Sequence, residues 1–489
     1  MWRFQVIIKK KFYVSGAWVE PVGSREFTLI NPSSEEPSGV ISLGDARDVD
    51  AAVEAAKAAF PAWSETPPAE RLAIVERLIE LYRSRSEEMG QAISLEMGAP
   101  IDLARGSQVG IGLANMRAYV AAFREMKLVD QLGAHAPDNR IALEPIGVVG
   151  LITPWNWPMN QVTLKVVAAL LAGCTMVLKP SEIAPLSSML FAELVHDAGV
   201  PAGVFNLVNG LGAEVGEALS RHPDVQMISF TGSTVAGIAV SRSAAETLKR
   251  VTLELGGKGA NLIFADHDGD AIRRSVAHCF LNSGQSCNAP TRMLVEQSIY
   301  DETVEAARAV AEATSVDVSH KPGNHIGPVV SERQFERVQR LIKAGIDEGA
   351  RLVAGGNGRP QHLNRGYFVR PTVFANVDNK MTIAQEEVFG PVLSIIPFAS
   401  EDDAVQIAND TPYGLTNYVQ TADGARRNRL ARRLRSGMVE MNGQPRGMGA
   451  PFGGIKSSGR AREGGRWGIE EFMEVKAISG WAEGIEAAE

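Results

Sequence analysis

Three side chains, far apart in the sequence, carry groups that could take part in covalent chemistry on a carbonyl carbon. Cys287 lies in the small polar turn 284–287, where a thiol is accessible and backbone N–H groups can stabilise a thiolate or an oxyanion. Glu254 ends a predicted strand ahead of two glycines, and a carboxyl in a ligand crevice acquires a raised pKa that suits proton abstraction near neutrality. Asn156 lies in a turn stiffened by two prolines and two tryptophans, so its amide could donate to a developing oxyanion. Together these groups indicate attack by a thiolate, followed by release by activated water.

Each of the three residues also has a purely structural interpretation, which the local sequence leaves open. Cys287 could be an unreactive cysteine that packs as a small apolar side chain. Glu254 could form a surface ion pair with Lys258. Asn156 could cap the helix that is predicted to begin near Met159.

The surrounding chain alternates between short apolar runs and longer stretches with helical spacing. This alternation is typical of a doubly wound parallel sheet with helices on both faces, in which ligands bind beyond the carboxyl ends of the strands. The sequence therefore predicts an α/β fold. The predicted strands are 148–152, 175–178, 204–208, 227–231 and 251–255, and the predicted helices between them are 159–172, 186–198, 213–220 and 234–249.

Two loops that follow these strands could hold a nucleotide. Residues 179–182 (KPSE) follow the second strand, where an acidic residue commonly accepts hydrogen bonds from a ribose hydroxyl. Residues 231–237 follow the fourth strand and open a helix, whose first N–H groups can bind phosphate. Residues 210–216 contain one residue too many for the G-x-G-x-x-G fingerprint and predict no site.

A second region with strand and helix patterns extends over about residues 260–443. It contains an amphipathic helix near 331–345 and strand-like runs at 351–354, 392–398 and 437–441. The run 474–480 also alternates like a strand, but it stands alone at the end of the chain. Because a lone strand needs a sheet to join, another domain or a partner subunit should supply one.

Composition and charge exclude several classes of protein. The chain has 489 residues, of which 45% are hydrophobic and 22% charged, so it is globular and long enough for two to four domains. A formal charge of −8 offers no attraction to nucleic acid or anionic membranes. Six arginines within 426–435 could form a nucleic-acid patch, but the apolar residues among them favour an exposed amphipathic helix.

The cysteines, histidines and apolar runs predict a cytoplasmic protein without a metal site. Three cysteines in no C-x-x-C pair cannot build a disulfide framework, and eight histidines form no metal-binding motif. Cys174 and Cys279 are flanked by apolar residues and are predicted to be buried. The apolar run 4–8 is too short for an export signal, and 166–178 is too short for a membrane helix.

Seven motifs, in order, resemble those of the aldehyde dehydrogenase superfamily over about residues 31–481. They are the turn that contains Asn156, KPSE (179–182), FTGST (230–234), ELGGK (254–258), GQSC (284–287), EEVFGP (386–391) and PFGGIK (451–456). The resemblance implies that Cys287 is the nucleophile, that Asn156 and a backbone N–H hold the oxyanion, and that Glu254 is the general base. Lys165 and Glu463 match positions on a proton path behind that base. An aldehyde would be oxidised by NAD+ to its carboxylic acid through a cysteine thiohemiacetal and a thioester.

The resemblance also implies a binding site for NAD and a tunnel for the aldehyde. Glu182 favours NAD over NADP, because its charge would repel a 2′-phosphate. The residues assigned to the cofactor are Lys179, Ser181 and Glu182 for the adenosine ribose, Trp155 and Ser233 near the pyrophosphate, Glu387 and Phe389 for the nicotinamide half, and also Ile152, Gly212, Phe230, Leu255 and Gly256. The tunnel would be lined by Trp157, Gln161, Asn288 and Phe452, a mainly apolar set that fits aliphatic, aromatic or terpenoid aldehydes, and no arginine is assigned to a substrate carboxylate.

The family pattern further implies an NAD-binding domain of residues 1–123 and 144–256 and a catalytic domain of residues 257–457. Residues 124–143 and 458–489 would form an oligomerisation segment, whose last strand extends a neighbouring subunit's sheet in a dimer or tetramer. One alternative is an acylating dehydrogenase that passes the thioester to coenzyme A; such enzymes generally lack the carboxylate supplied here by Glu254. Another is a non-catalytic family member, which is usually marked by loss of the nucleophile.

Overall fold

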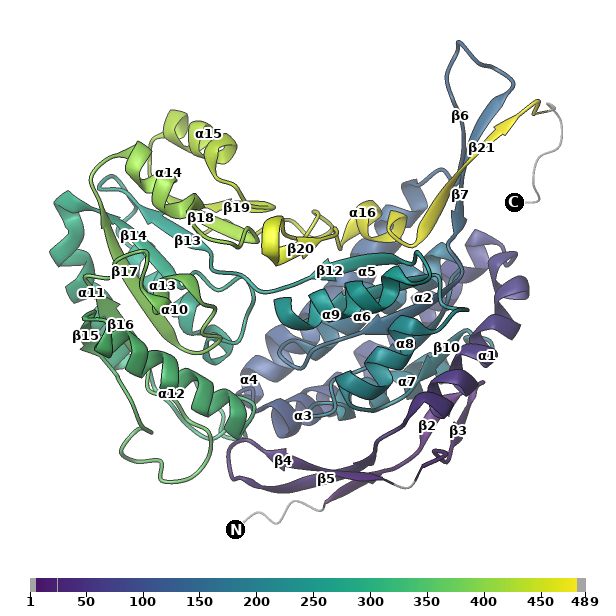
Figure 1. The fold of residues 1–489 in the computed structure, drawn as a ribbon, viewed down its shortest axis with the longest axis horizontal. Coiled ribbons are helices and arrows are strands. Elements are labelled where there is room, and N and C mark those ends of the chain that lie inside the picture. The colour runs from purple at the N-terminus through teal and green to yellow at the C-terminus, as the bar shows by residue number, and fades with distance from the viewer. Residues whose placement is uncertain (1–5, 24, 482–489) are drawn as a thin grey trace.

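The structure, a computed structural model, describes residues 6–23 and 25–481, which form two large α/β units and a projecting arm (Figure 1). One unit is built on an eight-stranded sheet and the other on a seven-stranded sheet, so the predicted α/β class is confirmed. Residues 4 and 5 of the apolar run 4–8 lie outside the described residues, as do residues 482–489 of the predicted oligomerisation segment.

The eight-stranded sheet contains all five strands predicted between residues 148 and 255. Its order is β20-β12-β11-β8-β9-β10-β2-β3, and the strands from β12 to β10 are parallel. The chain order reverses between β8 and β11, which is where parallel sheets of this kind bind ligands. The strands are β2 (Phe12–Val14), β3 (Ala17–Val19), β8 (Val148–Ile152), β9 (Thr175–Lys179), β10 (Phe205–Leu207), β11 (Met227–Thr231), β12 (Arg250–Glu254) and β20 (Gly459–Arg460).

Several predicted boundaries differ from the structure by one or more residues. Strand β12 ends at Glu254, one residue before the predicted end, and the N–H of Leu255 beyond it donates to the carbonyl of Ser458. The predicted helix 234–249 ends at Ala245, and Leu248 beyond it adopts a φ of 55°. The predicted helix 213–220 is a π-helical turn, Gly212–Gly216, followed by a short α-helix.

Helices cover both faces of this sheet. Helix α6 is buried along almost its whole length, because it lies between the sheet and the helices α2 and α5. Residues 48–60 and 70–82, whose apolar side chains recur at helical spacing, lie within α1 and α2. The helices are α1 (Ala46–Ser64), α2 (Pro68–Ser84), α3 (Ser86–Met97), α4 (Ile101–Leu103), α5 (Val109–Glu125), α6 (Pro158–Ala172), α7 (Leu186–Asp197), α8 (Glu217–Arg221) and α9 (Thr234–Ala245).

The seven-stranded sheet has the order β15-β16-β17-β14-β13-β18-β19, and only β15 is antiparallel to its neighbour. Its strands are β13 (Ala260–Ile263), β14 (Arg292–Glu296), β15 (Arg351–Ala354), β16 (Thr372–Ala375), β17 (Val392–Phe398), β18 (Thr416–Gln420) and β19 (Met438–Met441). Its helices are α10 (Ala271–Phe280), α11 (Tyr300–Ala313), α12 (Glu332–Asp347), α13 (Thr382–Gln385), α14 (Glu401–Asn409) and α15 (Gly424–Arg433).

The arginine-rich segment forms helix α15, as its apolar stripe predicts. Leu430 and Leu434 are buried, whereas Arg429 and Arg433 point outward and form ion pairs with Glu401. Among the described helices, none has the length and apolar character needed to cross a bilayer.

A small sheet forms the arm that projects from the eight-stranded unit (Figure 1). Strand β21 (Met473–Ser479) pairs with β7 (Asn139–Pro145) along its whole length, and β6 (Val129–Gln131) completes the sheet. The sequence predicts that another domain or a partner subunit supplies a sheet for the run 474–480. In the structure this run pairs with β7 of the same chain. Strand β20, in contrast, lies within the predicted oligomerisation segment but pairs with β12 of the eight-stranded sheet. The remaining elements are a sheet of β1 (Ile7–Lys9), β4 (Glu26–Asn31) and β5 (Glu36–Ser42), and the short helix α16 (Gly465–Glu470).

Candidate active site

Asn156 lies in the loop after β8, and its side chain is fixed by a hydrogen bond. Its Nδ2 donates to the carbonyl of Gln285 at 3.1 Å, and its backbone carbonyl accepts from Asn282 Nδ2 at 2.9 Å. The predicted capping role is wrong, because helix α6 begins after Trp157 without a side-chain cap. An amide has two N–H donors, so the bond to Gln285 orients the group and leaves the second donor available.

Cys287 follows a tight turn whose backbone is held in an uncommon conformation. Asn282 and Ser283 adopt φ angles of 54° and 58°, and the Trp157 Nε1 donates to the Ser286 hydroxyl at 2.8 Å. Cys287 is partly exposed, whereas Cys174 and Cys279 are buried as predicted.

The loop after β12 approaches Cys287 closely, and only glycine allows this approach. A methyl group at Gly257 would lie 2.3 Å from the carbonyl oxygen of Cys287. This contact brings the loop that begins at Glu254 against the nucleophile's backbone. The segments of Asn156, Glu254 and Cys287, which lie more than a hundred residues apart at their extremes, therefore meet in one place.

Glu254 is buried and carries no compensating hydrogen bond. It is 3% exposed, and within the described part of the chain neither carboxyl oxygen has a partner. The predicted ion pair with Lys258 is wrong, since the buried Nζ of Lys258 also lacks a partner there. Burial and the nearby carboxyl of Glu463 raise the pKa of Glu254 well above its ordinary value.

Lys165 and Glu463 form a buried ion pair near Glu254. Lys165 Nζ lies 2.6 Å from Glu463 Oε1 and 3.2 Å from the hydroxyl of Ser229 on β11. The positive charge of Lys165 lowers the pKa of Glu254, opposite to the effect of burial, so the two groups interact electrostatically. Lys165 and Glu463, which can both carry a proton, therefore lie in the buried interior near Glu254.

The surroundings of the Cys287 thiol disfavour its ionised form. Burial raises its pKa, and the carboxyls of Glu387 and Glu254 raise it further. The thiol therefore keeps its proton near neutrality and needs alkaline pH or a neighbouring base to become a thiolate.

The loops at the point of strand reversal offer polar groups suited to a dinucleotide. Lys179 Nζ, at the end of β9, donates to Glu182 Oε2 at 3.0 Å, and the Glu182 side chain is 28% exposed. Ser233 caps helix α9 by accepting from the N–H of Ala236 at 3.3 Å. The first N–H groups of a helix can bind phosphate, and a partly exposed acid beyond the second strand can bind ribose hydroxyls, so these residues fit such a ligand.

Glu387 and Phe389 lie close to the loops that carry Glu254 and Trp155. Glu387 is partly buried, and its Oε1 accepts from the N–H of Gly257 at 2.9 Å. Burial raises its pKa to about 7. The ring of Phe389 stacks edge-on against Trp155, with 5.4 Å between the ring centres. Glu387 is thereby bonded to the loop that contacts Cys287, and Phe389 lies against Trp155.

The other predicted residues occupy the ends of the same strands and the neighbouring loops. Ile152, Phe230 and Leu255 are buried at the ends of β8, β11 and β12, and Ser181 lies after β9. A methyl at Gly256 would meet Glu387, whereas Gly212 faces open space. Gln161 is buried in α6, and the carbonyl of Asn288 accepts from the Tyr418 hydroxyl at 2.5 Å.

Gln108 and Asn282 belong to the framework of the site but are missing from the sequence-based prediction. Gln108 Nε2 donates to the carbonyl of Asn156 at 3.1 Å and to Asn282 Oδ1 at 3.3 Å. Gln108 ends a π-helical turn, Ala104–Gln108, far upstream in the sequence. A buried glutamine beside an irregular helix leaves no periodic signal, so only the structure could identify it.

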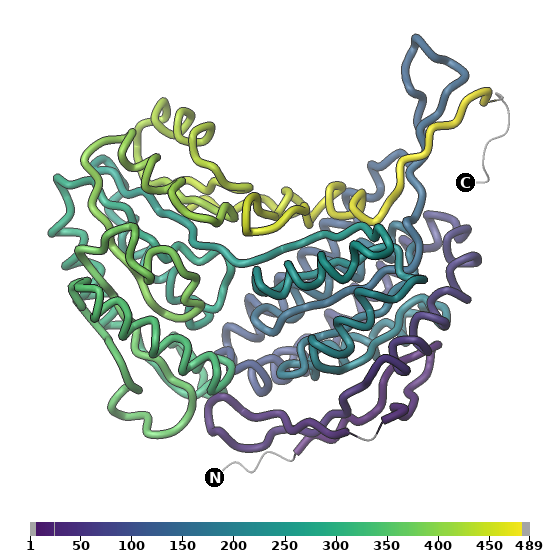
Figure 2. Tube along the Cα trace, viewed as in Figure 1, coloured from purple at the N-terminus to yellow at the C-terminus, as the bar shows by residue number. Residues whose placement is uncertain are grey.

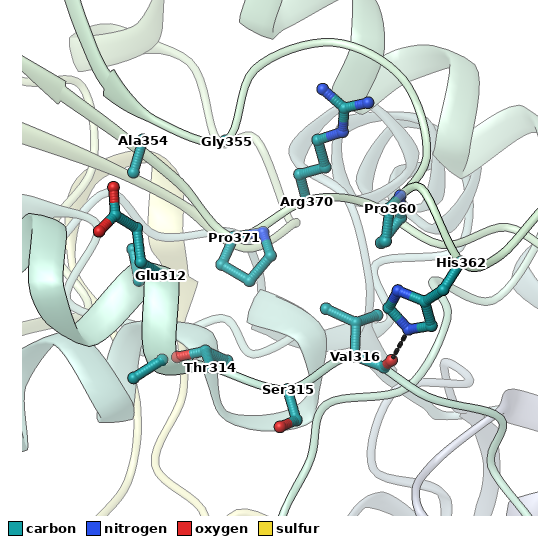
Figure 3. Close-up of a pocket in the computed structure, with 12 residues that line it drawn as sticks. Glu312, Thr314, Ser315, Val316, Ala354, Gly355, Pro360, His362, Arg370 and Pro371 are labelled. Atoms are coloured by element: carbon teal, nitrogen blue, oxygen red, sulfur yellow. Dashed lines mark hydrogen bonds between the residues drawn. The ribbon is translucent and has the colours of Figure 1, made fainter.

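Two pockets lie elsewhere and contain none of the predicted site residues. One, of about 340 Å³, is lined by α11, β15 and the loops that follow, and His362 Nε2 lies 2.9 Å from the Val316 carbonyl at its edge (Figure 3). The other, of about 780 Å³, lies between β1, α3 and α7.

Comparison with known proteins gives a consistent match over almost the whole chain. The model of the aldehyde dehydrogenase family matches residues 18–478. A 3-succinoylsemialdehyde-pyridine dehydrogenase from a Pseudomonas species is 48% identical over 96% of this chain and 98% of the relative. A putative aldehyde dehydrogenase from Staphylococcus saprophyticus is 44% identical over 96% of this chain and 98% of the relative.

Solved structures agree with the fold. An aldehyde dehydrogenase from Bartonella henselae is 58% identical, with a TM-score of 0.97 over 97% of this chain and 100% of the other. A mutant of aldehyde dehydrogenase C from Pseudomonas syringae, in complex with NAD+ and octanal, is 48% identical, with a TM-score of 0.95 over 97% of both chains.

Proposed function

Because the chain belongs to the aldehyde dehydrogenase family, we propose that it oxidises an aldehyde to the carboxylic acid with NAD+ through a thioester on Cys287 that water hydrolyses. The observation that carries this proposal is the meeting of three segments: the Asn156 amide bonds to the carbonyl of Gln285, and the loop after Glu254 contacts the Cys287 backbone. The test is to incubate the purified protein with NAD+ and an aldehyde, without coenzyme A, and to measure both reduced cofactor and free acid.

In this proposal Cys287 forms the first covalent intermediate and Asn156 stabilises it. The Cys287 thiol first loses its proton to solvent, and the thiolate then adds to the carbonyl carbon, whose oxygen becomes the oxyanion of a thiohemiacetal. The second N–H of the Asn156 amide and the backbone N–H of Cys287 donate to that oxyanion. One such fixed donor lowers the barrier by about 3–4 kcal/mol. Loss of hydride to the cofactor leaves a thioester on the sulfur.

Glu254 and the Lys165–Glu463 pair serve the hydrolytic step. Glu254 takes a proton from water, and the resulting hydroxide attacks the thioester and frees the acid. A buried carboxyl without a hydrogen-bond partner is suited to this, because its raised pKa makes it a stronger base. Lys165 and Glu463 provide a route by which the proton leaves Glu254 for the interior.

The cofactor would bind to the loops at the point of strand reversal. When bound, NAD+ would supply the hydride acceptor. Lys179 and Glu182 would hold the adenosine ribose, the N-terminus of α9 at Ser233 would bind the pyrophosphate, and Glu387 would hold the nicotinamide half. NAD+ is present in the complex of the Pseudomonas syringae relative and in that of a Bacillus cereus aldehyde dehydrogenase that is 38% identical, which supports this choice.

Glu182 should make the enzyme prefer NAD+ over NADP+ by at least about tenfold in kcat/KM, since its charge would oppose a 2′-phosphate by about 1.4 kcal/mol or more. Replacing it in Glu182→Gln should reduce that ratio by about the same factor. Steady-state kinetics with both cofactors measure the effect, and Glu336→Gln, an exposed change on α12, is the control. An unchanged or inverted ratio in the wild type, with NADP+ used as well as NAD+, would contradict the assignment.

We also propose a division of the chain into domains and an oligomeric assembly. We assign residues 1–123 and 144–256 to cofactor binding and residues 257–457 to catalysis. Among the described strands, β21 has a neighbour, β7, on one side only, and Val475 on it is 69% exposed. Exposed edge strands invite pairing, so the arm would join a second subunit in a dimer or tetramer.

Light scattering of the wild type should give a mass of two or four times the 52.5 kDa chain. Val475→Asp should weaken the assembly by at least about tenfold, because burying an unpaired carboxylate at an interface costs more than 1.4 kcal/mol. Leu248→Asp, at a site 93% exposed on another surface, should leave the mass unchanged. A wild-type mass equal to one chain at all concentrations would rule out this use of the arm.

The two rival functions predict different products. A CoA-acylating dehydrogenase would release acyl-coenzyme A and would form little free acid without coenzyme A. A non-catalytic family member would reduce no cofactor with any aldehyde. The buried, unpaired Glu254 favours hydrolysis over the first rival, and the partly exposed Cys287 argues against the second.

A further inference from the structure

Arg446 lies in the loop after β19 and makes few polar contacts for a guanidinium. Its Nε is buried and, among the described residues, has no hydrogen-bond partner. Its Nη1 donates at 3.0 Å to the sulfur of Met438, a weak acceptor. The guanidinium carbon lies 4.7 Å from the centre of the Phe452 ring, and the side chain as a whole is 31% exposed.

The position of Phe452 brings this guanidinium close to the reacting groups. The backbone of Phe452 exchanges two hydrogen bonds of 2.8 Å with Glu463, and a methyl at the next residue, Gly453, would lie 2.5 Å from Glu254 Oε1. The chain from β19 to β20, which contains these residues, runs from the seven-stranded sheet to the edge of the eight-stranded sheet (Figure 2). Burial lowers the pKa of Arg446, and the charges of Glu440 and Cys287 act on it in the opposite direction.

Glu440 is the carboxylate nearest to this arginine that the structure describes. It lies on β19 opposite Tyr418 of β18, and its Oε1 is 4.0 Å from Arg446 Nη1, too far for a hydrogen bond. Glu440 therefore balances the charge of Arg446 without occupying its donors. Within the described residues only the sulfur of Met438 accepts from this guanidinium, so its exposed N–H groups can donate to water or to an acceptor on a bound molecule.

Resting on the proposed function, we infer that Arg446 selects aldehydes that carry a second, uncharged hydrogen-bond acceptor, such as a ketone oxygen, along the chain beyond the aldehyde carbon. A guanidinium N–H would donate to that oxygen, while the Phe452 ring packs against the carbon chain.

The charges around the site explain why the acceptor is uncharged. A substrate carboxylate near Arg446 would also lie near Glu440, and Glu254 and Glu463 are close by. Like charges in a partly buried site repel strongly, so the attraction to one guanidinium is offset. A ketone oxygen keeps the hydrogen bond without this repulsion.

The experiment compares three aldehydes of equal chain length: an unsubstituted aliphatic aldehyde, an aldehyde with an internal ketone, and a semialdehyde with a terminal carboxylate. The wild type should favour the ketone over the aliphatic aldehyde by about 10- to 100-fold in kcat/KM, the range for a hydrogen bond to a charged group. In Arg446→Met this ratio should fall to within about threefold of unity. In Glu440→Gln, kcat/KM for the carboxylate should rise by about tenfold or more relative to the ketone.

Each outcome bears on a separate claim. Equal use of aliphatic and ketone aldehydes by the wild type, or an unchanged ratio in Arg446→Met, would overturn the inference, as would a wild-type preference for the carboxylate. No oxidation of any aldehyde would refute the proposed function itself. Arg432→Met, on the exposed face of α15, is the matched control and should keep the wild-type ratio. Arg446→Lys and the binding of NAD+ to each variant distinguish a lost contact from a lost fold: the lysine variant should retain charge but only part of the preference.

Discussion

Cys287→Ala is expected to abolish aldehyde oxidation, with kcat/KM lowered by at least about 10³-fold. The reason is that Cys287 is a partly exposed cysteine whose backbone contacts the loop after Glu254, and alanine removes the sulfur that would bond to the substrate. The measurement is the absorbance of reduced cofactor with a panel of aldehydes. The effect should fall on kcat/KM for all of them alike, because the nucleophile is common to every substrate.

Cys279→Ala is the matched control for this change. Cys279 is buried, burial raises its pKa to about 12, and it contacts the core of the seven-stranded unit. Its replacement should cost about 1 kcal/mol of stability and leave the rate within about twofold. If Cys287→Ala kept wild-type activity, the covalent route would be wrong. If the wild type itself reduced no cofactor, the non-catalytic alternative would gain support.

The strands that position the site could be predicted from sequence because their signals are local. The apolar runs of β8 and β11 gave the observed bounds, since each strand is buried on both faces of a parallel sheet. Glu254, Asn156 and Cys287 were identifiable because each stands next to such a strand or in a turn of small or rigid residues. Which of the structural and chemical interpretations applies to each could not be decided from neighbours alone.

What the sequence could not supply are pairings between distant segments. Strand β21 pairs with β7 more than three hundred residues upstream, and β20 joins β12 although its two residues carry no strand pattern. The stacking of Arg446 on Phe452 depends on the path of an irregular loop. Such contacts are set by the whole fold, which periodicity within a segment does not encode.

Glu254→Gln should separate the two halves of the proposed reaction. The amide keeps the shape of the carboxyl but cannot take a proton from water. We therefore expect one equivalent of reduced cofactor per active site to form rapidly, followed by a steady-state rate about 10²- to 10⁴-fold below wild type. The acyl group should then be detectable on Cys287 by mass spectrometry of the intact protein, and Glu336→Gln should show neither effect.

The pH dependence of the same variant gives the sharpest test of Glu254 as the base. The base acts when deprotonated, and burial and Glu463 raise its pKa well above that of an ordinary carboxyl. Hydrolysis by the wild type should therefore slow as the pH falls through this raised pKa, well before an exposed glutamate would be protonated. In Glu254→Gln this acid limb should disappear from the hydrolysis rate, whereas the rise at alkaline pH that reflects ionisation of Cys287 should remain in the burst. An unchanged acid limb in the variant would assign the base to another group, and wild-type release that depends on coenzyme A would favour the acylating alternative.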